Sequence, residues 1–254
     1  MKNKFKGIYL FISSVFIGLF HLTFAFAKSV SGNRLFHVVS PVATPGMNDD
    51  SLQTAADRSS ARSVYDSLQL RFRGLSQEAF DYARRGFDKL IEQGRLLNDS
   101  IISIIDFSLP SSEKRLFVLD MKNYQILYQT LVSHGQNSGQ LYAVNFSNVN
   151  STHMSSPGFY LTRETYQGGN GYSLKLDGLE RGINDNAYNR GIVVHGANYV
   201  NDALARSRGW IGRSHGCPAV PAQESRPIID RIKNGTCLFI YHPSYINRSP
   251  LLNS

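Results

Sequence analysis

The chain has very little cysteine, with only Cys217 and Cys237 among its 254 residues. Two cysteines allow one disulfide, but Cys237 lies in the apolar run of residues 236–241, where a small buried thiol is expected. Cysteine therefore gives the fold one cross-link at most, and Cys217, which lies outside any apolar run, needs a separate explanation.

Long apolar runs are also scarce, because only residues 7–20 form one. Lysines precede this run and Ala25-Phe26-Ala27 follows it, which predicts a cleavable signal peptide over residues 1–27. The run is shorter than the roughly 20 residues of a membrane-spanning helix, and no comparable run occurs later. No cysteine lies near the cleavage site, which argues against a lipoprotein. We expect an exported protein without a stable membrane span after cleavage; a retained signal anchor is the alternative.

A basic run and an aromatic platform are absent, although the formal net charge is +8. Without these features, nucleic acid is not an expected partner. Removal of residues 1–27 takes away Lys2, Lys4 and Lys6 and no acid, so the charge of the mature chain falls to +5. In an exported protein this surplus suits an anionic envelope surface, or it serves solubility alone.

Two segments precede the main domain. Residues 28–61 have too few large apolar residues for a core and predict a flexible leader. Residues 62–100 predict a helical appendage, a pair of helices of which the second begins after Ser76 and stops before Gly94. The apolar face of this second helix consists of Phe80, Ala83, Phe87, Leu90 and Ile91. We expect the pair to cover the β core rather than to bind a partner.

Residues 101–246 predict a mainly β domain, built as a sandwich or barrel with a flanking helix, and residues 247–254 form a C-terminal tail. After Pro110 the hydrophobic period becomes two, which predicts a hairpin with its turn at residues 121–123. Further short strands are expected at residues 141–144, 159–162, 173–176, 191–195 and 237–241.

Glycine and asparagine crowd the gaps between these strands, as in residues 167–171 and 184–186, and they predict long loops. One late helix is expected over residues 226–233, after Ser225 and before Gly235. The chain has no internal repeats.

Cys217 lies in a glycine-punctuated turn, because residues 211–221 read IGRSHGCPAVP. A cysteine nucleophile needs a histidine within hydrogen-bond reach, and two candidates exist. They are His195, which ends the apolar segment of residues 192–195, and His215. The N–H groups of His215, Gly216 and Cys217 are candidates to face the oxyanion of an attacked carbonyl. The pattern predicts nucleophilic catalysis by a thiol whose pKa is lowered toward neutrality.

Two other interpretations of these residues stay open. The tetrapeptide formed by residues 214–217 arises by chance often enough to be purely structural. His195, His215 and Cys217 also offer the donor types that zinc prefers, and three ligands leave an open catalytic position. Against zinc, the chain has neither a fourth fixed ligand nor a recognisable metal-binding spacing.

Residues 192–196, IVVHG, followed by residues 212–217, GRSHGC, resemble the murein L,D-transpeptidase (YkuD-like) catalytic domain. The signature of that family is a histidine, a spacer and then Ser/Thr-His-Gly-Cys. The resemblance extends over about residues 114–241 and favours the subgroup that reads Gly-Cys-Pro-Ala. It is also carried by residues 133–135, 146–148, 156–160, 176–180 and 216–220. Directly after the cysteine, Pro218-Ala219 departs from the main family pattern. The family's specificity for the acyl donor is therefore not carried over to this chain.

The resemblance implies an L,D-transpeptidase-like fold and assigns roles to the site. Cys217 is implied as the nucleophile, His195 as its base and His215 as a supporting residue. The resemblance implies that the carbonyl of Gly196 orients the His195 imidazole. Ser214 and Gly216 belong to the orienting and oxyanion group.

Arg213 is a candidate to bind a substrate carboxylate by a bidentate contact, or it is a solvated loop charge. No metal site is assigned.

The implied activity is that of an exported cysteine acyltransferase on peptidoglycan tetrapeptide stems, in the periplasm or cell envelope. The thiolate attacks the third residue, releases D-alanine and leaves a thioester, without a metal or organic cofactor. An amine then gives a cross-link, whereas water gives a tripeptide, as an L,D-carboxypeptidase does. The alternatives are a zinc-dependent murein peptidase and a non-catalytic wall-binding module. The oligomeric state is not predicted.

Overall fold

The computed structural model describes residues 60, 62 and 64–253. The predicted signal peptide lies outside the described residues, and so does the predicted leader except for residue 60. Within the described part of the chain, no helix is both long enough and apolar enough to cross a membrane.

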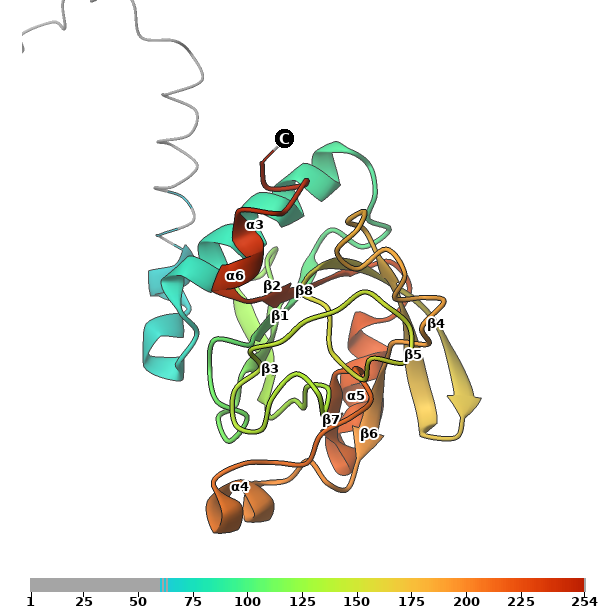
Figure 1. The fold of residues 1–254 in the computed structure, drawn as a ribbon. Helices are drawn as coiled ribbons and strands as arrows, with labels where there is room; N and C mark the ends of the chain where they lie inside the picture. The colour runs from blue at the N-terminus through green and yellow to red at the C-terminus, as the bar shows by residue number, and fades with distance from the viewer. Residues whose placement is uncertain (1–59, 61, 63, 254) are drawn as a thin grey trace, which may run out of the picture. The chain divides into compact units, whose positions relative to one another are not determined.

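The described residues form one eight-stranded sheet in the order β3-β2-β1-β8-β4-β5-β6-β7 (Figure 1). The β1–β8 and β6–β7 pairs are parallel, and the other neighbours are antiparallel. The strands are β1 (Ile101–Asp106), β2 (Leu116–Asp120), β3 (Gln125–Thr130), β4 (Gly158–Gly168), β5 (Gly171–Gly178), β6 (Val193–Ala197), β7 (Ala219–Pro221) and β8 (Cys237–Tyr241). The predicted mainly β fold is confirmed.

The two ends of this sheet are joined by hydrogen bonds that lie beyond the regular strands. The Ser133 N–H, just after β3, donates to the Ala219 carbonyl in β7 at 2.8 Å. Next to it, the Ser214 N–H donates to the His134 carbonyl at 3.0 Å, and Gly135 pairs with Ser214 in a parallel bridge. The sheet therefore curls into a near-barrel, and its closure brings the segment before Cys217 against residues 133–136.

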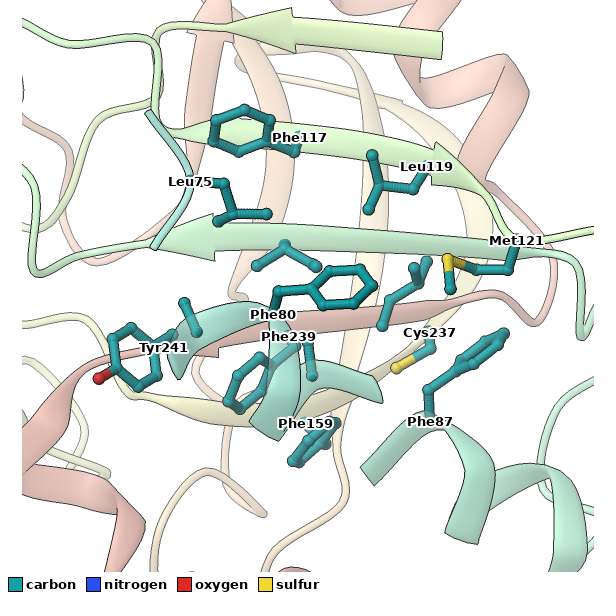
Figure 2. Close-up of a cluster of buried hydrophobic side chains, with 14 of the residues drawn as sticks. Leu75, Phe80, Phe87, Phe117, Leu119, Met121, Phe159, Cys237, Phe239 and Tyr241 are labelled. Carbon is teal, nitrogen blue, oxygen red and sulfur yellow. The ribbon is translucent and has the colours of Figure 1, made fainter. Parts of the chain in front are cut away.

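Apolar side chains cover both faces of the central strands. Strand β1 is buried along its whole length, and it sends Ile102 and Ile104 into one core cluster and Ile101 and Ile105 into another. Helix α3 (Gln77–Glu92) covers the first cluster, and α5 (Ala222–Ile232) contributes Ile228, Ile229 and Ile232 to the second (Figure 1). Figure 2 shows the first cluster, in which Cys237 is fully buried as predicted.

Helix α3 begins as predicted, because the Ser76 side chain accepts from the Ala79 N–H at 3.2 Å. Its buried face packs against β1 and β8, so the expectation that the helix covers the β core is confirmed. Gly86 is required there, since a Cβ on it would lie 2.0 Å from the ring of Phe159. Ile91, which was predicted on the buried face, is instead 36 % exposed at the end of the helix.

Several elements differ from the sequence-based expectations. Residues 141–144 form no strand, and residues 167–171 form a tight β4–β5 turn rather than a long loop. Helix α5 starts at Ala222, earlier than predicted, and contains Pro227 in its interior. The pattern did not predict β1, β7, η1 (Leu70–Arg73), α4 (Asp202–Arg208) or α6 (Pro243–Ile246).

A buried carboxylate ties the C-terminal residues to the sheet. Glu180 is 1 % exposed and accepts hydrogen bonds from the Phe159 N–H and from the hydroxyls of Tyr245 and Ser249. Replacement by alanine would leave the Phe159 N–H and the Ser249 hydroxyl without this acceptor, and the Tyr245 hydroxyl with only Ser249 to bind. We expect Glu180→Ala to lower the free energy of unfolding by about 3–5 kcal/mol in urea titrations. Glu164→Ala, which removes an exposed carboxylate, is the control and should change it little; equal effects would contradict this role.

Candidate active site

The turn that carries Cys217 is shaped by its own residues. The Ser214 hydroxyl accepts from the Gly216 N–H at 3.0 Å and donates to the Cys217 carbonyl at 2.6 Å. Gly216 has φ 121°, a conformation that side chains other than hydrogen rarely allow. A Cβ there would also lie 2.8 Å from the Met154 carbonyl oxygen. The Ser-x-Gly-Cys pattern is therefore a requirement of the turn that presents the thiol.

The Cys217 thiol is 9 % exposed and donates to the Gly191 carbonyl, with the sulfur 3.7 Å from the oxygen. Burial raises its pKa, while backbone hydrogen bonding from Val193, the charge of Arg190 and the backbone of Cys217 itself oppose that rise. The expectation of a pKa lowered toward neutrality was wrong for this state, because the sequence does not reveal how far a turn is buried. In this structure the resting sulfur is a neutral thiol. Both cysteines are free, so no disulfide joins them.

His195 lies in β6 and is 4 % exposed. Its Nδ1 is 3.0 Å from the Gly196 carbonyl, so Nδ1 carries the proton and Nε2 keeps a lone pair. Burial lowers the pKa of this imidazole, and the bond to Gly196 opposes the shift. His195 is therefore neutral at pH 7 and is able to accept a proton.

The β6–β7 register relates His195 to Cys217. His195 pairs with Ala219 in the parallel ladder, and continuing the register back by two residues puts Cys217 opposite Val193. Cys217 lies two residues before β7, so the thiol and the imidazole are carried by neighbouring segments of the chain. No hydrogen bond joins the two side chains in the described structure, since the thiol is turned toward Gly191.

His215 is exposed, and its ring stacks on that of His153 with centroids 4.1 Å apart and planes 9° apart. The Nδ1 of His153 is in turn 2.9 Å from the Gln136 side-chain nitrogen. No sequence pattern connects His153 with this site, because the contact joins two loops far apart in the chain. The stack fixes the outer side of the Cys217 turn.

Arg213 contacts the chain itself. Its Nη1 donates to the carbonyls of Gln136 and Gly139 at 3.1 and 3.0 Å, and its guanidinium carbon lies 5.5 Å from the centroid of the Trp210 ring. These bonds brace the loop of residues 136–139 against the turn, a contact that the sequence did not indicate. In this structure they also occupy one nitrogen of the guanidinium for which the sequence suggested a bidentate contact with a substrate carboxylate or a solvated loop charge.

Behind this loop lies a fully buried cation. The Arg115 guanidinium donates to the carbonyls of Val132 and Leu109, and its Nη2 is 2.7 Å from His134 Nδ1. His134 Nε2 donates to the Gly139 carbonyl at 3.1 Å, because Nδ1 must accept from the arginine. Burial and the Arg115 charge lower the pKa of His134 to about 3. The pair holds the two chain segments that close the barrel beside the Cys217 turn.

We expect acid to destabilise the fold through His134. Between its folded pKa of about 3 and the usual value of about 6.5, the unfolded chain binds one more proton, so stability falls as pH falls. The expected slope is roughly 1.4 kcal/mol per pH unit, measured by urea unfolding at several pH values. His195 and His242, whose pKa values burial also lowers, act in the same direction. His134→Gln keeps a donor and an acceptor and should flatten the slope; an unchanged slope would contradict this assignment.

The described residues offer no group of three or more His, Cys, Asp or Glu side chains that could hold a metal ion. The zinc hypothesis required His215 to turn inward with His195 and Cys217, whereas its ring packs outward on His153. The site is built around one thiol, one neutral imidazole and a tightly bonded turn.

A family model of the L,D-transpeptidase catalytic domain matches residues 72–241. This match spans well over half of the sequence, and the chain belongs to the L,D-transpeptidase catalytic domain family. The chain matches no curated protein.

Solved structures show some likeness to the chain. An L,D-transpeptidase from Stackebrandtia nassauensis is 14% identical, with 65% of this chain and 66% of that chain covered and a TM-score of 0.35. One from Mycobacterium smegmatis is 12% identical, with 56% and 59% covered and a TM-score of 0.35. The helical cell shape determining protein Pgp2 from Campylobacter jejuni, as a mutant, is 11% identical, with 62% and 56% covered and a TM-score of 0.39. The matched part spans about three fifths of several such chains.

Proposed function

We propose that the chain is an exported cysteine acyltransferase that acts on peptidoglycan tetrapeptide stems as an L,D-transpeptidase. The observation that carries the proposal is a buried thiol on the Ser214–Cys217 turn, which leads into β7, next to β6, the strand that carries the neutral imidazole of His195. Membership of the L,D-transpeptidase catalytic domain family supports the reaction class.

In the first half-reaction, substrate binding turns the Cys217 thiol away from the Gly191 carbonyl and toward His195 Nε2. The imidazole takes the thiol proton while the sulfur attacks the carbonyl of the third stem residue. The C–N bond to the terminal D-alanine then breaks, and the proton on Nε2 passes to the leaving amine. A thioester on Cys217 remains. The Gly196 carbonyl keeps the imidazole in the tautomer that this exchange requires.

The oxyanion formed by the attack needs N–H donors close to the sulfur. In the described structure the N–H groups of His215 and Cys217 donate to no backbone carbonyl, whereas the Gly216 N–H is bonded to the Ser214 hydroxyl. We assign the oxyanion to the first two groups. Ser214 and Gly216 then act by fixing the turn, and His215, stacked on His153, supports it from outside.

In the second half-reaction, an amine of a neighbouring stem attacks the thioester, gives its proton to His195 and restores the thiol. Water in place of the amine gives a tripeptide, and the same site then acts as an L,D-carboxypeptidase. Such substrates lie outside the cytoplasm, so we place the protein in the periplasm or cell envelope, in agreement with the predicted signal peptide. Neither half-reaction requires a cofactor.

The experiment is incubation of the mature protein with disaccharide tetrapeptide, followed by analysis of muropeptides and free D-alanine. The proposal predicts D-alanine together with cross-linked dimers or tripeptides, and the ratio of the two products separates transfer from hydrolysis. A metal chelator should change neither the release of D-alanine nor the yield of dimers and tripeptides. Loss of these products with chelator would indicate a zinc peptidase. Sedimentation with murein without any product would indicate a wall-binding module and would overturn the proposal.

A further inference from the structure

Arg190, in the loop before β6, binds a segment that crosses the Cys217 turn. Its Nη1 donates to the Ser147 carbonyl at 2.7 Å and to the Ser156 hydroxyl at 2.6 Å, and its Nη2 donates to the Met154 carbonyl at 2.6 Å. Three bonds from one side chain thus hold both ends of residues 147–156, here called the 147–156 segment. The 147–156 segment itself contains no helix or strand.

The 147–156 segment lies directly on the turn. The Met154 carbonyl oxygen that Arg190 binds lies 2.8 Å from the position of a Cβ on Gly216, and the Ser155 hydroxyl donates to the Gly216 carbonyl at 3.0 Å. On the other side, the Cys217 thiol donates to the carbonyl of Gly191, the residue that follows Arg190. The arginine therefore borders the nucleophile through its own chain and through the segment it holds.

Arg190 is half-buried, and within the described residues no carboxylate forms an ion pair with it. Burial lowers its pKa, and the acidic groups that oppose this shift are the Tyr160 hydroxyl and the Cys217 thiol. A half-buried cation without a carboxylate partner is costly unless another negative charge forms nearby. The thiolate of Cys217 is such a charge.

Other titratable groups lie on the segments around the Cys217 turn. Tyr199 follows β6, and its pKa is raised to about 12 by burial and then by the Cys217 charge, so it is neutral at physiological pH. His195 is a neutral imidazole on β6, and His215 is exposed on the same turn as Cys217. Arg190 is thus the permanently charged group that opposes the rise in the pKa of Cys217 caused by burial.

We propose that Arg190 is a positioning residue of this site, which holds the 147–156 segment against the Cys217 turn and supplies the fixed positive charge beside which the thiol ionises. The proposal rests on Cys217 as the nucleophile of the proposed function. It adds a cation to the thiol and imidazole of the proposed reaction.

The test measures the rate of Cys217 alkylation by iodoacetamide as a function of pH, with peptide mass mapping to exclude Cys237. The midpoint of this profile reports the ionisation of the thiol, and the limiting rate at high pH reports its accessibility. Arg190→Gln removes the charge and Arg190→Lys keeps it. Arg181→Gln removes an exposed arginine of the same loop and is the matched control.

We expect Arg190→Gln to raise the midpoint by about one pH unit or more, because an opposite charge at close range shifts a pKa by that amount. The limiting rate should also rise as the 147–156 segment loosens. Arg190→Lys and Arg181→Gln should keep the wild-type midpoint within a few tenths of a unit. A wild-type midpoint in folded Arg190→Gln, or an equal shift in Arg190→Lys, would overturn the proposal.

Should Arg190→Gln fail to fold, Arg190→Lys decides the question. The midpoint of its alkylation profile should stay near that of the wild type. Added salt should raise this midpoint, because salt screens a partly exposed charge pair. A midpoint that does not change with salt concentration would overturn the proposal. Alkylation needs no substrate, so its outcome is independent of D-alanine release. A protein that releases no D-alanine yet shows the midpoint shift would refute the proposed reaction and retain the role of Arg190.

Discussion

Replacement of Cys217 by serine is expected to reduce D-alanine release from a tetrapeptide by a factor of about 10³ or more, because a hydroxyl is a far weaker nucleophile near neutral pH. The fold should survive, since a serine hydroxyl fits the space of the thiol and is able to donate to the same Gly191 carbonyl. Activity is measured as free D-alanine, and folding as a urea unfolding midpoint. Retention of more than about a tenth of the activity would remove the thiol mechanism.

Cys237→Ala is the matched control for that experiment. Cys237 is fully buried in the cluster under α3 and burial raises its pKa, so it has no route to chemistry. Its replacement should keep catalysis and cost about 1–2 kcal/mol of stability through a small cavity. The pair of variants separates loss of the nucleophile from loss of a cysteine.

Replacement of His195 by glutamine is expected to lower kcat/KM by about 10²–10⁴, the usual contribution of general acid–base catalysis. In the wild type, kcat/KM should fall as acid protonates this imidazole, and the fall should lie below the usual value of about 6.5 because burial lowers the pKa of His195. The variant should lose this acid limb. The measurement is kcat/KM for D-alanine release between about pH 4.5 and 8, a range that spans the ordinary histidine pKa.

His242→Asn serves as the control for His195. His242 accepts from the Ser244 N–H at the start of α6, and asparagine is able to replace that cap. Its pKa is also lowered by burial, so an acid limb that came from His242 would disappear in this variant. Persistence of the acid limb in His195→Gln would contradict the assignment of His195 as the base.

The strands that the sequence predicts well are those with a clear period or a clear boundary. The hairpin of β2 and β3 has its turn where the sequence predicts it, and β8 begins and ends where an apolar run does. Strand β1 has no alternation because all of its residues are buried, between α3 on one side and the second core cluster on the other. Strands β2 and β8 are buried throughout as well, but the predicted turn and the apolar run marked their ends. The predicted strand at residues 141–144 has an apolar pattern, but that stretch forms irregular loop structure.

The residues of the candidate site likewise divide into those that a local sequence pattern marks and those that only tertiary contacts reveal. Cys217 was identifiable because a motif marks it, and His195 because it ends an apolar segment, although β6 continues beyond it to Ala197. Gly196 was identifiable through the resemblance. Arg190 and His153 carry no local mark, since their partners lie on loops far away in the sequence. The pKa of Cys217 was predicted in the wrong direction because burial of the turn by the 147–156 segment is a tertiary effect. Local pattern thus locates the nucleophile, while its environment comes from packing.

The acyl-enzyme is the central claim of this account, and intact protein mass after brief incubation with disaccharide tetrapeptide tests it most directly. The account predicts an adduct of the substrate minus D-alanine, mapped to Cys217, absent in Cys217→Ser and long-lived when amine acceptors are withheld. Absence of any adduct, in a protein whose thiol is shown to be reduced and whose products nevertheless include D-alanine, would contradict a thioester route.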